Sequence, residues 1–249
     1  MKIGVIGVGA IGGTIAKKLV KAGNDLKVAN SRGKSAVKEF ADEIGAQPSD
    51  MDEVSQDVDV LIISIPYGAV SSLPESLFEK LPSDAIIIDT GNYYPEMRDD
   101  PIEGLGNGES ESLWVSNQIK KPVIKAFNTL LAHSLAELGC EKGNGRRLAM
   151  QVAGDDESQK KIVIDLIDQC GFDSYDAGTL EESWKMQPGS AGYCCDYNLD
   201  ELKEIKEKSR QTPESVAKNR AKVMGNFAEL TNGDFSHENV IRINRKYNI

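Results

Sequence analysis

Several features that mark specialised proteins are scarce in this 249-residue sequence. Only 6% of the residues are aromatic, and no apolar run is long enough for a signal peptide or a membrane span. Positive charge is not in excess, since 29 Lys and Arg stand against 39 Asp and Glu, for a formal net charge of −10. Because negative charge repels phosphate backbones and anionic lipid, we expect no nucleic-acid partner and no membrane association. Because the sequence shows no signal peptide or membrane span, we expect a cytoplasmic location.

Thiol and imidazole groups are also few. The four cysteines, Cys140, Cys170, Cys194 and Cys195, show neither a metal-ligand spacing nor a disulfide framework, so we predict reduced thiols and no metal site. A strained bridge between the adjacent Cys194 and Cys195 is the less common alternative. The two histidines belong to no local catalytic signature, and the catalytic residues stay unassigned. His133 could touch a substrate ring, or it could be an ordinary helix histidine.

What is present is the composition of a folded enzyme-sized protein, with 40% hydrophobic and 27% charged residues. Short apolar segments alternate with amphipathic helical ones, and the segments expected to be strands are 2–6, 25–30, 59–66, 85–92 and 122–128. These segments are continuously apolar, which is typical of parallel strands covered on both faces by helices. Residues 147–154 and 172–178 are further strands of this sheet or of a small extension, and a helix is expected between them.

The character of the sequence changes after Gly192, where long apolar runs give way to charged amphipathic helices. Thr212 and Pro213 are a predicted N-cap and first helical residue, and Asn232-Gly233 is a predicted stop. We expect this tail to pack on its own domain or on a second subunit. The sequence thus divides into a domain of residues 1–192 and a helical appendage of residues 193–249. The run EGLGNGESES at 103–112 is a predicted loop.

A glycine motif follows the first predicted strand and opens a helix. Its spacing, G-x-G-x-x-G, permits a tight turn, a close approach of backbone to a pyrophosphate, and close packing of helix on strand. Helix N-H groups then receive the anionic charge. We therefore predict a Rossmann-type, doubly wound, mostly parallel α/β sheet with the C-terminal helical appendage. The predicted dinucleotide contacts in this turn are Gly7, Val8, Gly9, Ala10, Ile11 and Gly12.

The end of the second strand lacks the acid that normally accepts both ribose hydroxyls of NAD. The sequence there is VANSRGK, with Asn30, Ser31, Arg32 and Lys34. Hydroxyl and cationic groups in that place suit the 2'-phosphate of NADP, so we predict NADP as the cofactor. The alternative is that Arg32 and Lys34 are solvated surface charges.

The motifs together resemble those of a known family. GVIGVGAIGGTIAKKLVKAGNDLKVANSR, VDVLIISIP, VIKAFNTL, the VAGDD segment and LEESW are similar to the coenzyme F-420-dependent NADP oxidoreductases. They are also similar to the N-terminal oxidoreductase domain of the STEAP metalloreductases. The resemblance covers about residues 1–186. It implies hydride transfer between NADP(H) and a flavin-like or other small-molecule acceptor, with little acid–base work for side chains.

The resemblance also implies which residues follow the later strands in the cofactor cleft. These are Ser64, Ile65, Pro66, Asn92, Ala126 and Asn128. Ligands of open α/β sheets bind at the carboxyl ends of strands, which favours the same choice. The structural alternative is that Pro66 ends a strand and that Asn92 and Asn128 form turns.

The C-terminal region departs from the family pattern, so the identity of the acceptor stays open. One alternative is an imine or ketone reductase of the pyrroline-carboxylate reductase or hydroxyacid dehydrogenase type. Those families need an apolar helical domain of about a hundred residues, and the charged tail here is shorter. A second alternative is a non-catalytic NADP(H)-sensing module whose helical tail responds to occupancy. We expect the chain to form a homodimer.

Overall fold

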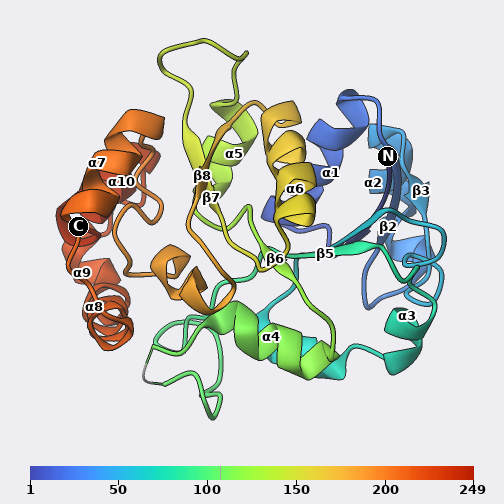
Figure 1. The fold of residues 1–249 in the computed structure, drawn as a ribbon, viewed down its shortest axis with the longest axis horizontal. Helices are drawn as coiled ribbons and strands as arrows, with labels where there is room; N and C mark the ends of the chain where they lie inside the picture. The colour runs from blue at the N-terminus through green and yellow to red at the C-terminus, as the bar shows by residue number, and fades with distance from the viewer. Residues whose placement is uncertain (107) are drawn as a thin grey trace.

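The computed structural model describes residues 1–106 and 108–249. Its central sheet has six parallel strands in the order β3-β2-β1-β4-β5-β6 (Figure 1). The strands are β1 (Lys2–Ile6), β2 (Asp25–Ala29), β3 (Gln47–Pro48), β4 (Val60–Ile63), β5 (Ile86–Asp89) and β6 (Ile124–Lys125). The chain runs outward in one direction from β1 and in the other from β4. A crevice is therefore expected at the carboxyl ends of these two neighbours.

Helices cover both faces of the sheet, because successive strand residues are apolar on both sides. On one face Val60 and Ile62 of β4 join a core with α1 (Ala10–Lys21), α2 (Lys34–Ile44) and α6 (Glu157–Gln169). On the other face Leu61 and Ile63 pack with η1 (Tyr67–Ser72), α3 (Glu75–Glu79) and α4 (Glu111–Ile119). Figure 1 shows these two layers above and below the sheet. The predicted doubly wound parallel sheet is confirmed.

Two later strands form a small sheet of their own. β7 (Ala149–Val152) and β8 (Asp173–Asp176) pair in parallel and flank α6, as the sequence predicts. An antiparallel bridge between Lys125 and Ala153 joins this pair to β6, with backbone N···O distances of 2.8 and 3.0 Å. Of the two placements open from the sequence, the structure shows the small extension.

The C-terminal region is helical, with α7 (Leu199–Lys208), α8 (Pro213–Gly225), α9 (Phe227–Thr231) and α10 (His237–Tyr247). The side chain of Thr212 accepts a hydrogen bond from the backbone N-H of Ser215 at 3.3 Å, so the predicted N-cap of α8 is confirmed. Asn232 ends α9 in a left-handed conformation. Val223, Met224 and Ile243 form a core with Tyr94 of the main domain. The tail therefore packs on its own chain.

Two sequence-based boundaries need correction. Part of the predicted loop 103–112 is helical, because α4 begins at Glu111 where burial of Ser110 and Glu111 overrides their polar character. Asn107 lies outside the described residues. β6 is also shorter than the predicted segment 122–128, since Phe127 takes a positive φ of 62° that no regular strand accommodates.

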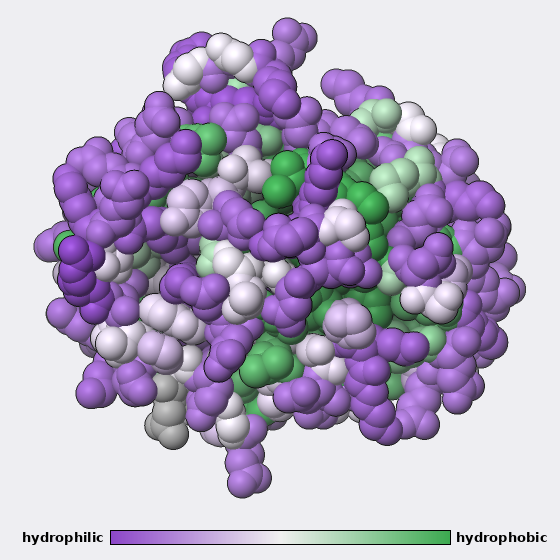
Figure 2. All heavy atoms as spheres, viewed as in Figure 1, coloured by the Kyte–Doolittle hydropathy of each residue, from purple (hydrophilic) through white to green (hydrophobic). Residues whose placement is uncertain are grey.

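The exposed surface is largely polar, as expected for a sequence in which 27% of the residues are charged. Figure 2 shows polar residues over most of one face, including the C-terminal helices, with hydrophobic residues visible mainly near the middle of the molecule. In the described part of the chain, none of the helices has the length and apolar character needed to cross a bilayer. All four cysteines are free, and Cys194 and Cys195 are buried.

Candidate functional site

A cleft of about 460 Å³ opens at the carboxyl ends of β1, β2 and β4. It lies where the strand order reverses, the position at which open α/β sheets bind ligands. The structure brings together nine of the sixteen predicted site residues in its lining: Gly7, Val8, Gly9, Asn30, Ser31, Arg32, Ser64, Ile65 and Pro66. Met51, Ala69 and the turn from Ser72 to Pro74 complete the walls.

The three motif glycines differ in what surrounds them. Gly7 takes a positive φ of 92°, and a Cβ there would lie 2.2 Å from the carbonyl oxygen of Ser64. A Cβ on Gly12 would lie 2.0 Å from the carbonyl oxygen of Gly7 and 2.8 Å from Cβ of Ser64. A Cβ on Gly9 would meet nothing within 4 Å. Gly7 and Gly12 thus serve the turn and the packing of α1 on the sheet, whereas the backbone at Gly9 faces open space that a ligand can approach.

The start of α1 offers backbone donors without a built-in acceptor. Gly9 is the N-cap and has no side chain to accept the first N-H groups, and the first turn contains no acidic residue. Ala10, Ile11 and Gly12 are the first residues of this helix and do not line the cleft themselves. A helix end of this kind favours negative charge, through unsatisfied N-H groups and the helix dipole.

The loop after β2 presents a free cation. Oδ1 of Asn30 accepts a hydrogen bond from the backbone N-H of Arg32 at 2.9 Å, so Asn30 shapes the loop. Ser31 and Arg32 are exposed at the rim. Within residues 1–106 and 108–249, the Arg32 guanidinium has no hydrogen bond or ion pair. Lys34 lies outside the cleft lining, and its Nζ is 3.7 Å from Oε2 of Glu53.

The remaining predicted residues lie at the ends of β5 and β6, beyond the lining of this cleft. Nδ2 of Asn128 donates to Oδ1 of Asn92 at 3.0 Å, and Nδ2 of Asn92 donates to the carbonyl oxygen of Asn128 at 3.1 Å. Ala126 is fully buried and belongs to the core of the sheet. Oδ1 of Asn128 is buried and has no hydrogen-bond partner in the described structure.

A buried ion pair supports this end of the sheet, and sequence reasoning missed it. Nζ of Lys125 lies 2.9 Å from Oδ2 of Asp89, and both side chains are at most 2% exposed. The same oxygen accepts hydrogen bonds from Ser112 Oγ at 2.7 Å and Tyr67 OH at 3.2 Å. Lys125 Nζ also donates to the carbonyl oxygen of Gly91. The available signal was a single charged residue inside each of two apolar segments, IIIDTGN and VIKAFN.

A second buried acid connects this pair to the C-terminal helices. Burial raises the pKa of Glu111 from 4.5 to about 7, although Lys125 and Arg220 act in the opposite direction. Arg220 of α8 places its guanidinium 3.6 Å from Oε1 of Glu111 and 3.3 Å from Oε1 of Glu96. The backbone N-H of Tyr93 donates to Oε2 of Glu111 at 3.2 Å. One charged network therefore extends from the strand ends to α8.

The two histidines lie together, away from the cleft lining. Their ring centroids are 4.5 Å apart, and Nε2 of His237 is 2.9 Å from Oδ2 of Asp196. Ser134 donates its hydroxyl to the same carboxylate oxygen at 2.9 Å. Because Ser134 bonds to the acid and not to imidazole, this is no nucleophilic triad. The cluster holds α10 against α5 (Ala132–Glu137), and in the described residues no group of three or more metal-ligating side chains occurs.

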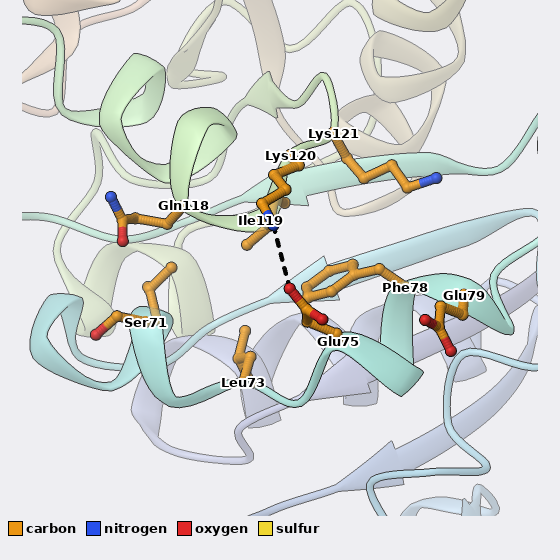
Figure 3. A pocket seen from close by; sticks show the side chains of 10 residues that line it. Ser71, Leu73, Glu75, Phe78, Glu79, Gln118, Ile119, Lys120 and Lys121 are labelled. Atoms are coloured by element: carbon orange, nitrogen blue, oxygen red, sulfur yellow. Dashed lines mark hydrogen bonds and ion pairs between the residues drawn. The ribbon is translucent and has the colours of Figure 1, made fainter.

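A separate hollow of about 370 Å³ borders the cleft on the α3 side (Figure 3). It shares Leu73 with the cleft, and an exposed ion pair between Lys120 and Glu75, 3.1 Å apart, crosses it. Two exposed, paired side chains gain little from each other and are screened by salt. Among the described residues that line this hollow, no buried polar groups converge, so the cleft at the carboxyl ends of β1, β2 and β4 is the stronger candidate.

Comparison with known proteins identifies relatives of the N-terminal part most clearly. Residues 2–93 match the family described as "NADP oxidoreductase coenzyme F420-dependent". The F420-dependent NADP reductase of Methanocaldococcus jannaschii is 29% identical over 201 residues, covering 74% of this chain and 86% of that protein. The Escherichia coli protein YjhV is 39% identical over 56 residues. That match spans only 22% of this chain and 41% of YjhV.

Solved structures agree on the fold. A hypothetical protein from Sinorhizobium meliloti is 27% identical, with a TM-score of 0.61, and the match covers 75% of this chain and 89% of that one. An imine reductase from Myxococcus stipitatus in complex with NADP⁺ shares the fold at 14% identity and a TM-score of 0.52. The match covers 73% of this chain but only 56% of that enzyme. Much of the imine reductase therefore has no counterpart in the matched region.

Proposed function

We propose that the chain belongs with the coenzyme F420-dependent NADP oxidoreductases, which it resembles, that it binds NADP(H) in the cleft at the carboxyl ends of β1, β2 and β4, and that it transfers hydride to or from a small-molecule acceptor. The observation that carries the proposal is the unpaired Arg32 guanidinium at the rim, beside Asn30 in place of an acid. A 2'-phosphate offers this guanidinium charge-assisted hydrogen bonds, and no carboxylate from Asn30 opposes it.

The residues of the cleft fit the rest of the cofactor. The open backbone at Gly9 and the unsatisfied start of α1 would hold the pyrophosphate, and Ser64, Ile65 and Pro66 would form the opposite wall. We assign the far end to Asn92 and Asn128, where the buried Oδ1 of Asn128 can accept an amide N-H. When bound, the cofactor supplies the hydride chemistry. The protein supplies position, charge and exclusion of water.

The runner-up, an imine or ketone reductase of the hydroxyacid dehydrogenase or pyrroline-carboxylate reductase type, needs a large helical substrate domain. Here the region after residue 192 consists of α7, α8, α9 and α10, which belong to residues 199–247 and fold back onto the same chain. The tail thus packs against its own sheet domain. We place the boundary between this domain and the appendage near residue 192. We retain the homodimer and the cytoplasmic location as parts of the proposal, the first to be tested by light scattering.

The discriminating experiment measures both binding and turnover. Purified protein is titrated with NADPH by calorimetry and then incubated with NADPH and a panel of flavins, a deazaflavin, quinones and imines, with NADPH absorbance as the readout. Oxidation of NADPH that depends on a flavin, deazaflavin or quinone supports the proposal. Turnover confined to imines favours the runner-up. Tight NADPH binding without any turnover points to a sensing module, and absence of NADPH binding contradicts the proposal.

A further inference from the structure

A second cavity, of about 330 Å³, lies between the main domain and the C-terminal helices. Its walls are mostly apolar, formed by Tyr94, Leu131, Tyr193, Met224, Phe227 and Val240. These residues come from the segments after β5 and β6, the chain before α7, and α8, α9 and α10. The cavity therefore exists only because the C-terminal helices fold back onto the sheet domain.

The cavity adjoins the far end of the proposed cofactor site. Tyr94 follows Asn92 by two residues and Leu131 follows Asn128 by three, so the chain cannot separate them by more than about 7 to 11 Å. Arg98 contacts both the Asn92 end of the proposed cofactor site and the Tyr94 wall of the cavity. Its guanidinium donates to the carbonyl oxygen of Asn92 at 2.6 Å and lies 5.3 Å from the centroid of the Tyr94 ring.

One buried polar atom in the lining has no partner. Nδ2 of Asn244 donates to the carbonyl oxygen of Cys194 at 2.8 Å, which fixes the orientation of the amide. Its Oδ1 is left buried and without a hydrogen bond among the described residues, although Asn244 is only 3% exposed. A buried acceptor without a partner costs free energy, so a ligand that donates a hydrogen bond there gains more than it would in water.

We propose that this cavity binds a flat, apolar molecule of one or two rings that carries a hydroxyl donor, which Asn244 Oδ1 accepts. The volume is at the small end of ligand sites, which suits one or two fused rings rather than a larger cofactor. Tyr94, Tyr193 and Phe227 supply aromatic surface for such a ring.

The assignment of a quinone and its hydroquinone to this cavity, as the hydride acceptor and its product, rests on the proposed function. Both have this shape. The hydroquinone carries the hydroxyl that donates to Asn244 Oδ1, whereas the quinone oxygens only accept, so we expect the cavity to bind the reduced form more tightly. Reduction of a quinone to the hydroquinone consumes two electrons and two protons. Hydride from NADPH brings both electrons and one proton, and solvent brings the other.

The test is direct binding, measured by calorimetry on the full chain with and without NADP⁺. The probe is 1-naphthol, and its matched control is 1-methoxynaphthalene, which has the same rings but no donor. We expect 1-naphthol to bind about tenfold more tightly than the control, the scale of one buried hydrogen bond. Asn244→Leu should abolish this difference. Val240→Phe, which adds ring volume without altering a polar group, should weaken both probes and leave NADPH affinity unchanged.

Equal affinity for the two probes would overturn the role of Asn244, and failure of 1-naphthol to bind folded protein that binds NADPH would overturn the site. Failure of NADPH to bind while 1-naphthol binds would contradict the proposed function but not the cavity. Because Asn244→Leu also removes the contact to Cys194, circular dichroism of each variant verifies that it is folded. Val240→Phe keeps the test valid if Asn244→Leu does not fold.

Discussion

The role of an individual residue in this protein depends on the atoms that surround it, and the effect of adding or removing a single group reveals that role. The contrast between Gly9 and Gly12 shows this most clearly, since one faces open space and the other faces backbone at a distance no Cβ can tolerate. Both belong to the same motif, yet their physical roles separate cleanly. The buried Lys125–Asp89 pair is a second example, because each charge is acceptable only while the other is present.

Replacing each glycine by alanine should separate folding from binding. Gly12→Ala should lower the free energy of unfolding by about 1 to 3 kcal/mol, the usual cost of overpacking, because α1 must move off the sheet. Gly9→Ala should leave stability nearly unchanged and weaken NADPH by about tenfold, since the added Cβ occupies space meant for the pyrophosphate. Urea unfolding and calorimetry measure the two effects. The reverse pattern would refute these roles.

Removing one partner of the buried pair should be more damaging than removing both charges. Lys125→Met leaves the Asp89 carboxylate buried without a cation and should cost about 3 to 5 kcal/mol of stability. The double variant Asp89→Asn, Lys125→Met should recover a large part of that loss. Denaturant unfolding of the wild type, both single variants and the double variant checks this. Additive losses in the double variant would show that the two groups do not depend on each other.

At the scale of elements, the N-terminal ends of the helices show where residues close in sequence stabilise the fold. Asp156, Asn198 and Thr212 are N-caps whose side chains accept backbone N-H groups. Ser236, the N-cap of α10, makes no such bond. Two helices that begin with the same class of residue therefore depend on it differently.

Thr212→Ala should lower the free energy of unfolding by about 1 kcal/mol, because a backbone N-H group at the start of α8 loses its hydrogen-bond acceptor. The matched control is Ser236→Ala, which removes a hydroxyl from an N-cap position without removing a cap bond, and its effect should be within about 0.5 kcal/mol. Thermal and urea unfolding compare the two. Equal losses of stability in the two variants would show that the capping hydrogen bond of Thr212 does not stabilise the protein.

Elements with strong local signals could be predicted from the sequence, and those defined by tertiary contacts could not. The strands β1, β2, β4 and β5 and the helices α1, α2 and α6 follow from continuous apolar runs and helical periodicity. The start of α4 at Glu111 was missed because burial, not propensity, makes it helical. In the site, the glycine turn and the rim were predictable. The buried Asp89–Lys125 pair and the cavity at Asn244 depend on segments distant in sequence that meet only in the fold.

At the scale of the whole molecule, the charged network links the strand ends to the C-terminal helices. Glu111 is its central acid, and Lys125, Arg220 and Asp89 are the charged groups that act on it. Since Arg220 belongs to α8, the protonation state of one buried carboxyl is coupled to how the tail sits on the sheet domain. The protonation of Glu111 and the packing of α8 on the sheet domain should therefore change together.

The pH dependence of stability should show this coupling. The pKa of Glu111 is raised in the folded state from 4.5 to about 7, so between these values the folded protein keeps a proton that the unfolded chain has lost. The contribution of Glu111 to stability is therefore present at low pH and decreases as pH rises through this window, by about 3 kcal/mol in all.

Glu111→Gln keeps the shape of the side chain and removes the titration. The stability of the wild type relative to this variant should fall between pH 5 and pH 8, as measured by urea unfolding at each pH. Glu103→Gln, at an exposed acid in the segment before α4, serves as a control for the loss of an acid nearby in sequence. A relative stability that is constant or rises with pH would contradict the raised pKa.

The central claim is that Arg32 holds the phosphate that distinguishes NADPH from NADH. Calorimetry of both cofactors with the wild type, Arg32→Ala and Lys34→Ala tests it most directly. We predict that Arg32→Ala weakens NADPH by about 1.5 to 3 kcal/mol and leaves NADH nearly unchanged. Lys34→Ala, which removes a cation already facing Glu53, should change either cofactor little. If Arg32→Ala weakens both cofactors equally, or if the wild type prefers NADH, the account is wrong.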